Sequence, residues 1–230
     1  MIINGKWDLK MLPHREKQWA IWNERPRGWE PDRLDSVVEH LRPGYKIFDI
    51  GAEQGDFSAL WACHGAQVAM VEPQPAFWPG IKATWEMNTD VPPLGTFCGF
   101  ATHPGEANSR PTAPYQWVTE AHGEIEPEPH FMRTFDYPDL KKTTIDMMTR
   151  EYGAPDGITM DIEGAELQAL RGGATTLMED RPEVWVSVHP VFMKDYHDTK
   201  ESLLLFMEQM EYNAEHLATD HEEHWLFLPR

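Results

Sequence analysis

The sequence is poor in cysteine. Cys63 and Cys98 are the only two among 230 residues, which is too few for a disulfide framework, and they do not stand at a metal-ligand spacing. Low cysteine use is typical of proteins that work in a reducing compartment. We therefore expect a cytoplasmic protein.

Long apolar runs are also missing. No stretch approaches the ~20 apolar residues that a membrane-spanning helix needs, and the opening MIINGKWDLK lacks the pattern of a signal peptide. Hydrophobic residues make up 41% and charged residues 25%, a balance typical of globular domains. The length suits one domain with an appended segment.

Positive charge is scarce. Lys and Arg number 20 against 38 Asp and Glu, so the formal net charge is -18. Such a chain repels phosphate backbones and anionic lipid surfaces. We expect neither nucleic acid nor a membrane as a partner.

Tryptophan is plentiful near the N-terminus, where Trp7, Trp19, Trp22 and Trp29 stand among Lys, Arg and Pro. Residues 1–30 are predicted to form either a helical cap that packs its indoles on the domain or a lid over a small-molecule site. The domain itself is predicted to span 31–230.

From residue 31 onward, helical and β-type patterns alternate. This alternation predicts an α/β fold with a mostly parallel sheet and helices on both faces. Many Pro, Gly, Ser and acidic residues interrupt the rhythm at 102–139, which predicts an excursion or loop over one face. The expected strands are 45–50, 67–71, 94–100, 157–161, 183–188, 212–218 and 224–228. The expected helices are 34–41, 57–64, 76–88, 144–151, 164–179 and 199–211.

The stretch FDIGAEQGDFSAL (48–60) reads as a strand, a glycine turn and a helix start. Gly51 and Gly55 allow a tight turn and the close approach of a ligand to the backbone. The spacing is G-x-x-x-G rather than the dinucleotide fingerprint G-x-G-x-x-G, and Asp49 would repel a pyrophosphate. An acid here suits a ligand with a cationic amino group, such as S-adenosylmethionine, and disfavours a nucleotide-dependent oxidoreductase.

Two further strand ends carry acids. VAMVEP (68–73) puts Glu72 at the end of the second strand, where one carboxylate accepts hydrogen bonds from both ribose hydroxyls. ITMDIEGAE (158–166) puts Asp161 and Glu163 at the end of the fourth. Ligands of open parallel sheets bind beyond the carboxyl ends of the strands, so these acids should face one pocket. Glu166 is predicted to be only a first-turn helix acid, favoured by the helix dipole.

Four segments together resemble the FkbM family of S-adenosylmethionine-dependent methyltransferases: DIGAEQG (49–55), VEP (71–73), TTIDMM (143–148) and MDIEGAELQALRGG (160–173). The resemblance implies a class I methyltransferase fold with a final antiparallel strand, and O-methylation of a hydroxyl on a sugar or a related small molecule, with glycosides among the candidate acceptors. The sequence departs from the family pattern at Glu53, Thr159 and Ser187. The cofactor contacts that it implies are Asp49, Gly51, Ala52, Glu53, Gly55, Glu72, Pro73, Ala101 and Asp161.

Hydroxyl methylation needs an oriented acceptor and a sink for its proton. Asp161, Glu163 and His189, in VSVHP at the end of the fifth strand, are the candidates for this catalytic role. Two alternatives stay open: His189 is a structural histidine, or the three residues hold Mg²⁺ or Mn²⁺.

The acidic, His-rich run near the C-terminus, with His216, Asp220, His221 and His224, is interpreted as a solvated strand connection without a role. A non-catalytic cofactor-binding module of the same fold is the alternative to an enzyme. A nucleic-acid methyltransferase is disfavoured, because MDIEG stands where an N-P-P-Y or D-P-P-Y motif would follow the fourth strand.

Overall fold

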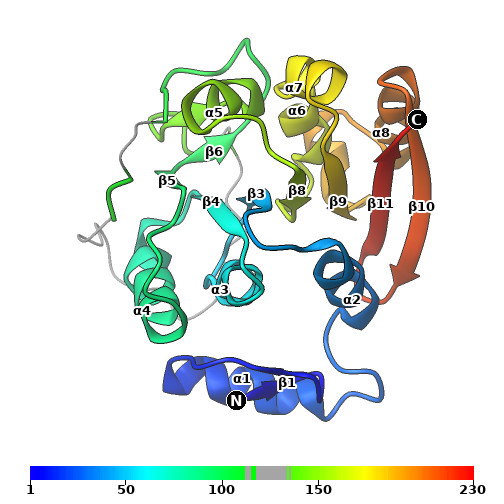
Figure 1. Ribbon diagram of the computed structural model, residues 1–230. Coiled ribbons are helices and arrows are strands. Elements are labelled where there is room, and N and C mark those ends of the chain that lie inside the picture. The colour runs from blue at the N-terminus through cyan, green and yellow to red at the C-terminus, as the bar shows by residue number, and fades with distance from the viewer. Residues whose placement is uncertain (112–114, 118–133, 135) are drawn as a thin grey trace.

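A central sheet of seven strands organises the protein, shown as a computed structural model in Figure 1. The structure describes residues 1–111, 115–117, 134 and 136–230. The order across the sheet is β10-β11-β9-β8-β3-β4-β5. These strands are β3 (Lys46–Ile50), β4 (Gln67–Glu72), β5 (Gly95–Cys98), β8 (Gly157–Met160), β9 (Glu183–Val188), β10 (Tyr212–Thr219) and β11 (Glu223–Pro229).

The strands around β3 are parallel. β3 pairs with β4 on one side and with β8 on the other, so that Phe48 stands opposite both Ala69 and Ile158. The chain thus continues from β3 to β4 on one side and later adds β8 on the other side. This change of direction makes the carboxyl end of β3 the topological switch point, where ligands bind in open α/β sheets. β11 runs antiparallel to both β9 and β10, which confirms the predicted final antiparallel strand.

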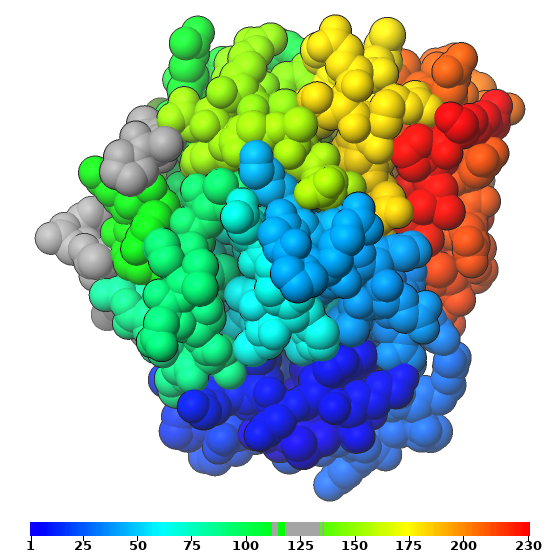
Figure 2. All heavy atoms as spheres, in the orientation of Figure 1, coloured from blue at the N-terminus to red at the C-terminus, as the bar shows by residue number. Residues whose placement is uncertain are grey.

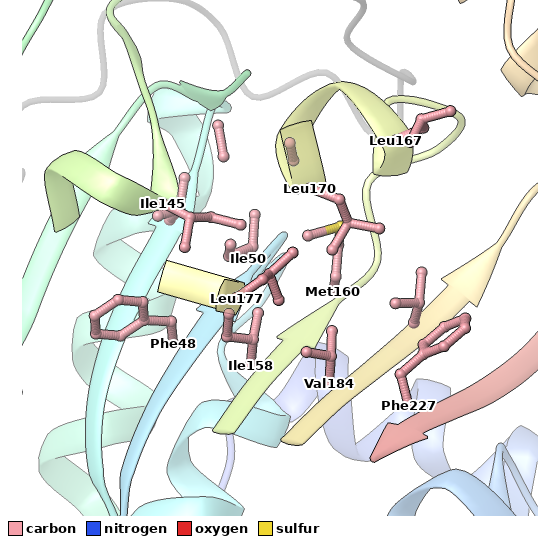
Figure 3. Close-up of a cluster of buried hydrophobic side chains, with 14 of the residues drawn as sticks. Phe48, Ile50, Ile145, Ile158, Met160, Leu167, Leu170, Leu177, Val184 and Phe227 are labelled. Atoms are coloured by element: carbon pink, nitrogen blue, oxygen red, sulfur yellow. The ribbon is translucent and has the colours of Figure 1, made fainter. Parts of the chain in front are cut away.

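One face of the sheet is covered by α5 (Ile145–Tyr152), α6 (Glu166–Arg171), α7 (Ala174–Glu179) and α8 (Lys200–Gln209) (Figure 1). Their apolar side chains pack on the strands in one buried cluster (Figure 3). Removing such surface from water is the main favourable term in folding.

The prediction of a single helix over 164–179 is wrong. The chain forms α6 and α7 with Gly172 and Gly173 between them. A Cβ on Gly172 would lie 2.1 Å from the carbonyl oxygen of Thr102, and one on Gly173 would lie 3.0 Å from Ile145. The two helices are separated at glycines that pack closely against the backbone of Thr102 and the side chain of Ile145.

The other face carries α2 (Pro31–His40), α3 (Asp56–Cys63) and α4 (Trp78–Asn88), preceded by the short helix η1 (Pro75–Phe77). The N-terminal segment lies beneath these helices and forms a continuous layer in Figure 2. It consists of the strand pair β1 (Ile2–Ile3) and β2 (Trp7–Asp8), followed by α1 (Pro13–Asn23). Trp19 is fully buried in the hydrophobic cluster of this face, and Arg15 pairs with Asp56 at 2.7 Å.

The prediction of one strand over 94–100 is also wrong. β5 ends at Cys98, and β6 (Phe100–Ala101) pairs instead with β7 (Lys142–Thr143) in a separate small sheet. A Cβ on Gly99 would lie 2.3 Å from the carbonyl oxygen of Lys141, so the chain turns toward β7 at this glycine.

Most of the predicted excursion at 102–139 lies outside the described residues. In its described part, the backbone N–H of Asn108 donates to the carbonyl of Lys142. Across the described residues, the structure contains no helix long and apolar enough to cross a membrane. The remaining short helix is η2 (Phe192–Tyr196).

Candidate active site

A cavity of about 490 Å³ opens beyond the carboxyl ends of β3, β4, β8 and β9. Residues from seven separate stretches of the chain form its wall, including the N-terminal segment and the turn before β11. The predicted site residues that line it are Asp49, Gly51, Ala52, Glu53, Glu72, Pro73, Ala101, Asp161, Glu163 and His189.

Gly55 is the exception, because it does not contribute to the cavity wall. It is the N-cap residue of α3 with φ 77°, and a Cβ there would lie 3.0 Å from Ile81 on α4. Its glycine allows a left-handed turn and the close packing of two helices, rather than contact with a ligand in the cavity.

Asp49 lies at the end of β3 and is almost fully buried. It accepts hydrogen bonds from the hydroxyls of Ser58 on α3 and Thr159 on β8, the latter at 2.7 Å. Burial raises the pKa of Asp49, although both hydroxyls oppose that shift. The carboxylate joins three elements around the glycine turn, so the turn has a fixed shape before any ligand binds.

Glu72 ends β4 and is equally buried. One carboxylate oxygen accepts the N–H of Glu53 at 2.9 Å and the other accepts the N–H of Gln74 at 2.7 Å. Each carboxylate oxygen can accept a second hydrogen bond, so the oriented group suits a pair of hydroxyls on one ligand. Burial raises the pKa of Glu72 to about 8, against the effect of the two backbone donors.

Asp161 and Glu163 follow β8 directly. Arg33 on α2 donates to Asp161 at 3.1 Å, and a second, shorter bond at 2.6 Å joins Arg33 to Glu30. Glu163 has φ 54°, an uncommon conformation for a residue with a side chain. Burial raises the pKa of Glu163 to about 8, although His189 opposes the shift.

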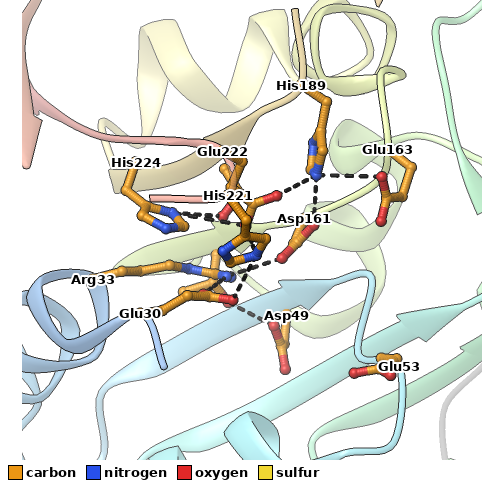
Figure 4. A network of polar contacts seen from close by, with 12 residues as sticks. Glu30, Arg33, Asp49, Glu53, Asp161, Glu163, His189, His221, Glu222 and His224 are labelled. Atoms are coloured by element: carbon orange, nitrogen blue, oxygen red, sulfur yellow. Dashed lines mark hydrogen bonds and ion pairs between the residues drawn. The ribbon is translucent and has the colours of Figure 1, made fainter. Parts of the chain in front are cut away.

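His189 follows β9 and lies among carboxylates (Figure 4). Its Nε2 lies 3.3 Å from Glu163 and 3.6 Å from Asp161 and contacts Glu222 directly. Its Nδ1 lies 2.8 Å from Glu166. Burial disfavours charge on the ring, but hydrogen bonds with Glu166 and Glu222 raise the pKa of His189 to about 12. The ring is therefore protonated at neutral pH.

Glu166 is more than a first-turn helix acid. It does stand in the first turn of α6, yet its side chain is fully buried, and its Oε1 accepts the N–H of Gly164 at 2.9 Å besides contacting His189. The helix start, the Asp161–Glu163 turn and the imidazole are thereby held together.

The interpretation of the C-terminal His-rich run as a solvated connection holds for His216 and Asp220, which are exposed, but is wrong for His224. His224 is only 1% exposed and Glu222 only 7%, and His221 and Glu222 line the cavity. His221 also stacks on Trp29 with ring centroids 4.1 Å apart. Because β11 returns antiparallel beside β9, with Glu223 opposite Val188, its leading turn lies next to His189.

The sequence reasoning also missed Glu30 and Arg33. Both are buried and line the cavity, and His221 approaches Glu30 to 3.6 Å. The sequence did offer one signal. Arg33 is a charged residue within the apolar pattern of a helix, and a buried charge requires a partner of opposite charge.

The strand order, with parallel strands around β3 and an antiparallel strand beside β9, defines the class I methyltransferase fold. The sequence matches the family model of the methyltransferase FkbM domain over residues 49–230. The chain belongs to the FkbM family of S-adenosylmethionine-dependent methyltransferases.

Solved structures share this fold at low sequence identity. The methyltransferase FkbM from Methylobacillus flagellatus KT is 21% identical with a TM-score of 0.51, and the match covers 85% of this chain and 50% of that one. Monomeric WbdD is 16% identical with a TM-score of 0.52, over 95% of this chain and 45% of that one. This chain thus spans about half the length of these relatives. It matches none of the curated proteins with which it was compared.

Proposed function

We propose that this protein transfers a methyl group from S-adenosylmethionine to a hydroxyl of a sugar or another small molecule. The observation that carries the proposal is the convergence of Asp161, Glu163 and His189 on a cavity that the glycine turn and Glu72 also line. Family membership supports the cofactor, and the hydroxyl acceptor rests on the chemistry of this site.

The cofactor half of the cavity fits the proposed ligand. Glu72 presents two oriented oxygens to ribose hydroxyls, and Asp49 lies beside the Gly51 turn, where a cationic amino group would find a negative partner. Phe100 and Ala101 contribute an apolar part of the cavity wall. When bound, S-adenosylmethionine supplies a methyl group on a positively charged sulfur.

The acceptor half would orient the hydroxyl and receive its proton. The hydroxyl loses this proton as the bond between its oxygen and the methyl carbon forms, so the site needs a proton acceptor close to that oxygen. Asp161 and Glu163 lie at the carboxyl-end edge of the sheet, where this acceptor is needed, and the protonated His189 ring holds both carboxylates in position. Trp22 and Trp29 of the N-terminal segment close this side of the cavity and would contact the acceptor.

The test replaces each carboxylate by its amide, which keeps shape and removes charge. Loss of a positioned base costs ~10²–10⁴ in rate, so kcat of Asp161→Asn and Glu163→Gln should fall by that order, while S-adenosylmethionine affinity stays near that of the parent. Methyl transfer is measured with a panel of neutral glycosides and isotopically labelled cofactor. Saturable cofactor binding without transfer to any acceptor would instead favour a non-catalytic module, and amide variants as fast as the parent would remove the catalytic role of the pair.

A further inference from the structure

Four carboxylates surround the ring of His189. Asp161, Glu163 and Glu222 approach Nε2, and Glu166 approaches Nδ1. A protonated imidazole offsets one of these charges. Two further cationic groups lie nearby: Arg33 pairs with Asp161 but is shared with Glu30, and His221 lies 3.2 Å from Glu222. The carboxylates still outnumber the cationic groups. Uncompensated charge inside a protein is costly. This part of the cavity therefore suits a bound cation.

The spacing of the side chains matches a metal shell. Nε2 of His189 lies 3.3 Å from Glu163 Oε2 and 3.6 Å from Asp161 Oδ1. Neighbouring ligand atoms around an octahedral Mg²⁺ are about 3 Å apart, because each stands about 2.1 Å from the ion. Glu222 approaches the same nitrogen from the side away from Glu163 (Figure 4). Carboxylates with one imidazole are a ligand set that suits Mn²⁺ or Mg²⁺.

An independent observation comes from Glu166, which lies outside this ligand set. Its fully buried carboxylate contacts Nδ1 of His189 at 2.8 Å and so turns Nε2 toward the cavity. Histidines that bind metals are almost always held in this way by a carboxylate or carbonyl on the second ring nitrogen. In addition, Oε1 of Glu222 is buried on the cavity wall without a well-aligned hydrogen bond, and Nε2 of His221 lies 3.2 Å from it.

We infer that Asp161, Glu163, His189 and Glu222 bind one divalent cation of the Mg²⁺ or Mn²⁺ type, and that Glu166 is the positioning residue of this site. Binding requires the proton on Nε2 to leave, as is general when metal sites load. The inference rests on the proposed function, because a cation here would lower the pKa of an acceptor hydroxyl.

The test is a titration of the full chain with Mn²⁺, with free Mn²⁺ followed by electron paramagnetic resonance and Mg²⁺ added as a competitor. The parent should show one saturable site. Glu222→Gln and Glu163→Gln should each weaken binding at least tenfold, and Glu166→Gln should weaken it by about 10–100-fold. The matched control is Glu215→Gln, an exposed acid on β10, which should bind like the parent. Thermal unfolding of every variant checks that the fold is retained.

A parent without a saturable site, or a folded Glu222→Gln that binds like the parent, overturns the inference. Activity then separates the two proposals. Unchanged methyl transfer after chelation with EDTA would contradict a role for the cation in the reaction and leave the proposed methyltransferase function intact. Mn²⁺ binding with no transfer to any hydroxyl would instead contradict the proposed function and leave the cation site.

Discussion

Gly51 lies against the backbone of Asp161, and a Cβ on Gly51 would stand 1.9 Å from that carbonyl oxygen. The contact joins the turn after β3 to the turn after β8, which are the proposed cofactor and acceptor sides of the cavity. Gly51 also has φ 88°, so both the conformation and the space favour glycine.

Gly51→Ala should therefore destabilise the protein by more than the cost of its backbone conformation. Gly44 provides the matched control, because it has φ 84° and open space where a Cβ would be. Gly44→Ala should cost roughly 1–2 kcal/mol, the price of a left-handed residue with a side chain, and Gly51→Ala clearly more. Urea unfolding measures both. Equal decreases in the free energy of unfolding would show that the backbone near Asp161 shifts to accept the added Cβ at no energetic cost.

Glu72→Ala should weaken S-adenosylmethionine binding by ~1–3 kcal/mol, the scale for leaving buried hydrogen-bonding groups without their partner. Titration calorimetry measures the affinity, and Glu86→Ala, an exposed acid on α4, is the control. An unchanged affinity in a folded Glu72→Ala protein would remove Glu72 from the cofactor site.

The raised pKa of Glu72 predicts a pH dependence of stability. Burial brings this pKa to about 8 in the folded protein, whereas in the unfolded chain it is about 4.3. Between these values the unfolded chain gives up the proton and the folded protein keeps it, so rising pH favours unfolding. In Glu72→Gln, the free energy of unfolding should fall less steeply from pH 5 to 8 than in the parent. Identical slopes in urea unfolding would mean that Glu72 ionises normally.

Trp29→Ala should impair acceptor use and leave the cofactor site intact. Trp29 lies between Trp22 and His221, with ring centroids 4.3 and 4.1 Å away, and it lines the cavity. Losing such ring contacts costs about 0.5–1.5 kcal/mol, so kcat/KM for the acceptor should fall roughly two- to tenfold. Trp7→Ala, outside the cavity wall, is the control. A point substitution is the better test because deletion of the segment would remove Trp19 from the core.

The proposed cofactor half of the cavity was accessible to sequence reasoning because its residues lie close together in the sequence. Asp49 and Glu72 end apolar strands, and the geometry of parallel sheets brings such strand ends to one edge. Glu222 was not accessible. Its contact with His189 depends on the antiparallel pairing of β11 with β9, which a local pattern of acids and histidines does not encode. The breaks at Gly99 and Gly172 likewise follow from backbone approaching from elsewhere in the chain.

The closure of the acceptor side by distant segments has a consequence for the order of folding. The proposed cofactor half is formed largely by consecutive elements from β3 to β6, although Thr159 on β8 also holds Asp49. On the proposed acceptor side, Arg33 and Asp161 are 128 positions apart, and His221 must reach Glu30 from near the opposite end of the chain. Long loops lose more entropy on closure and their contacts form more slowly. In pulsed hydrogen exchange during refolding, amides of β3 and β4 should gain protection before those of the turn that carries Glu222. A newly folding chain would thus acquire the means to hold its methyl donor before it acquires the means to use it.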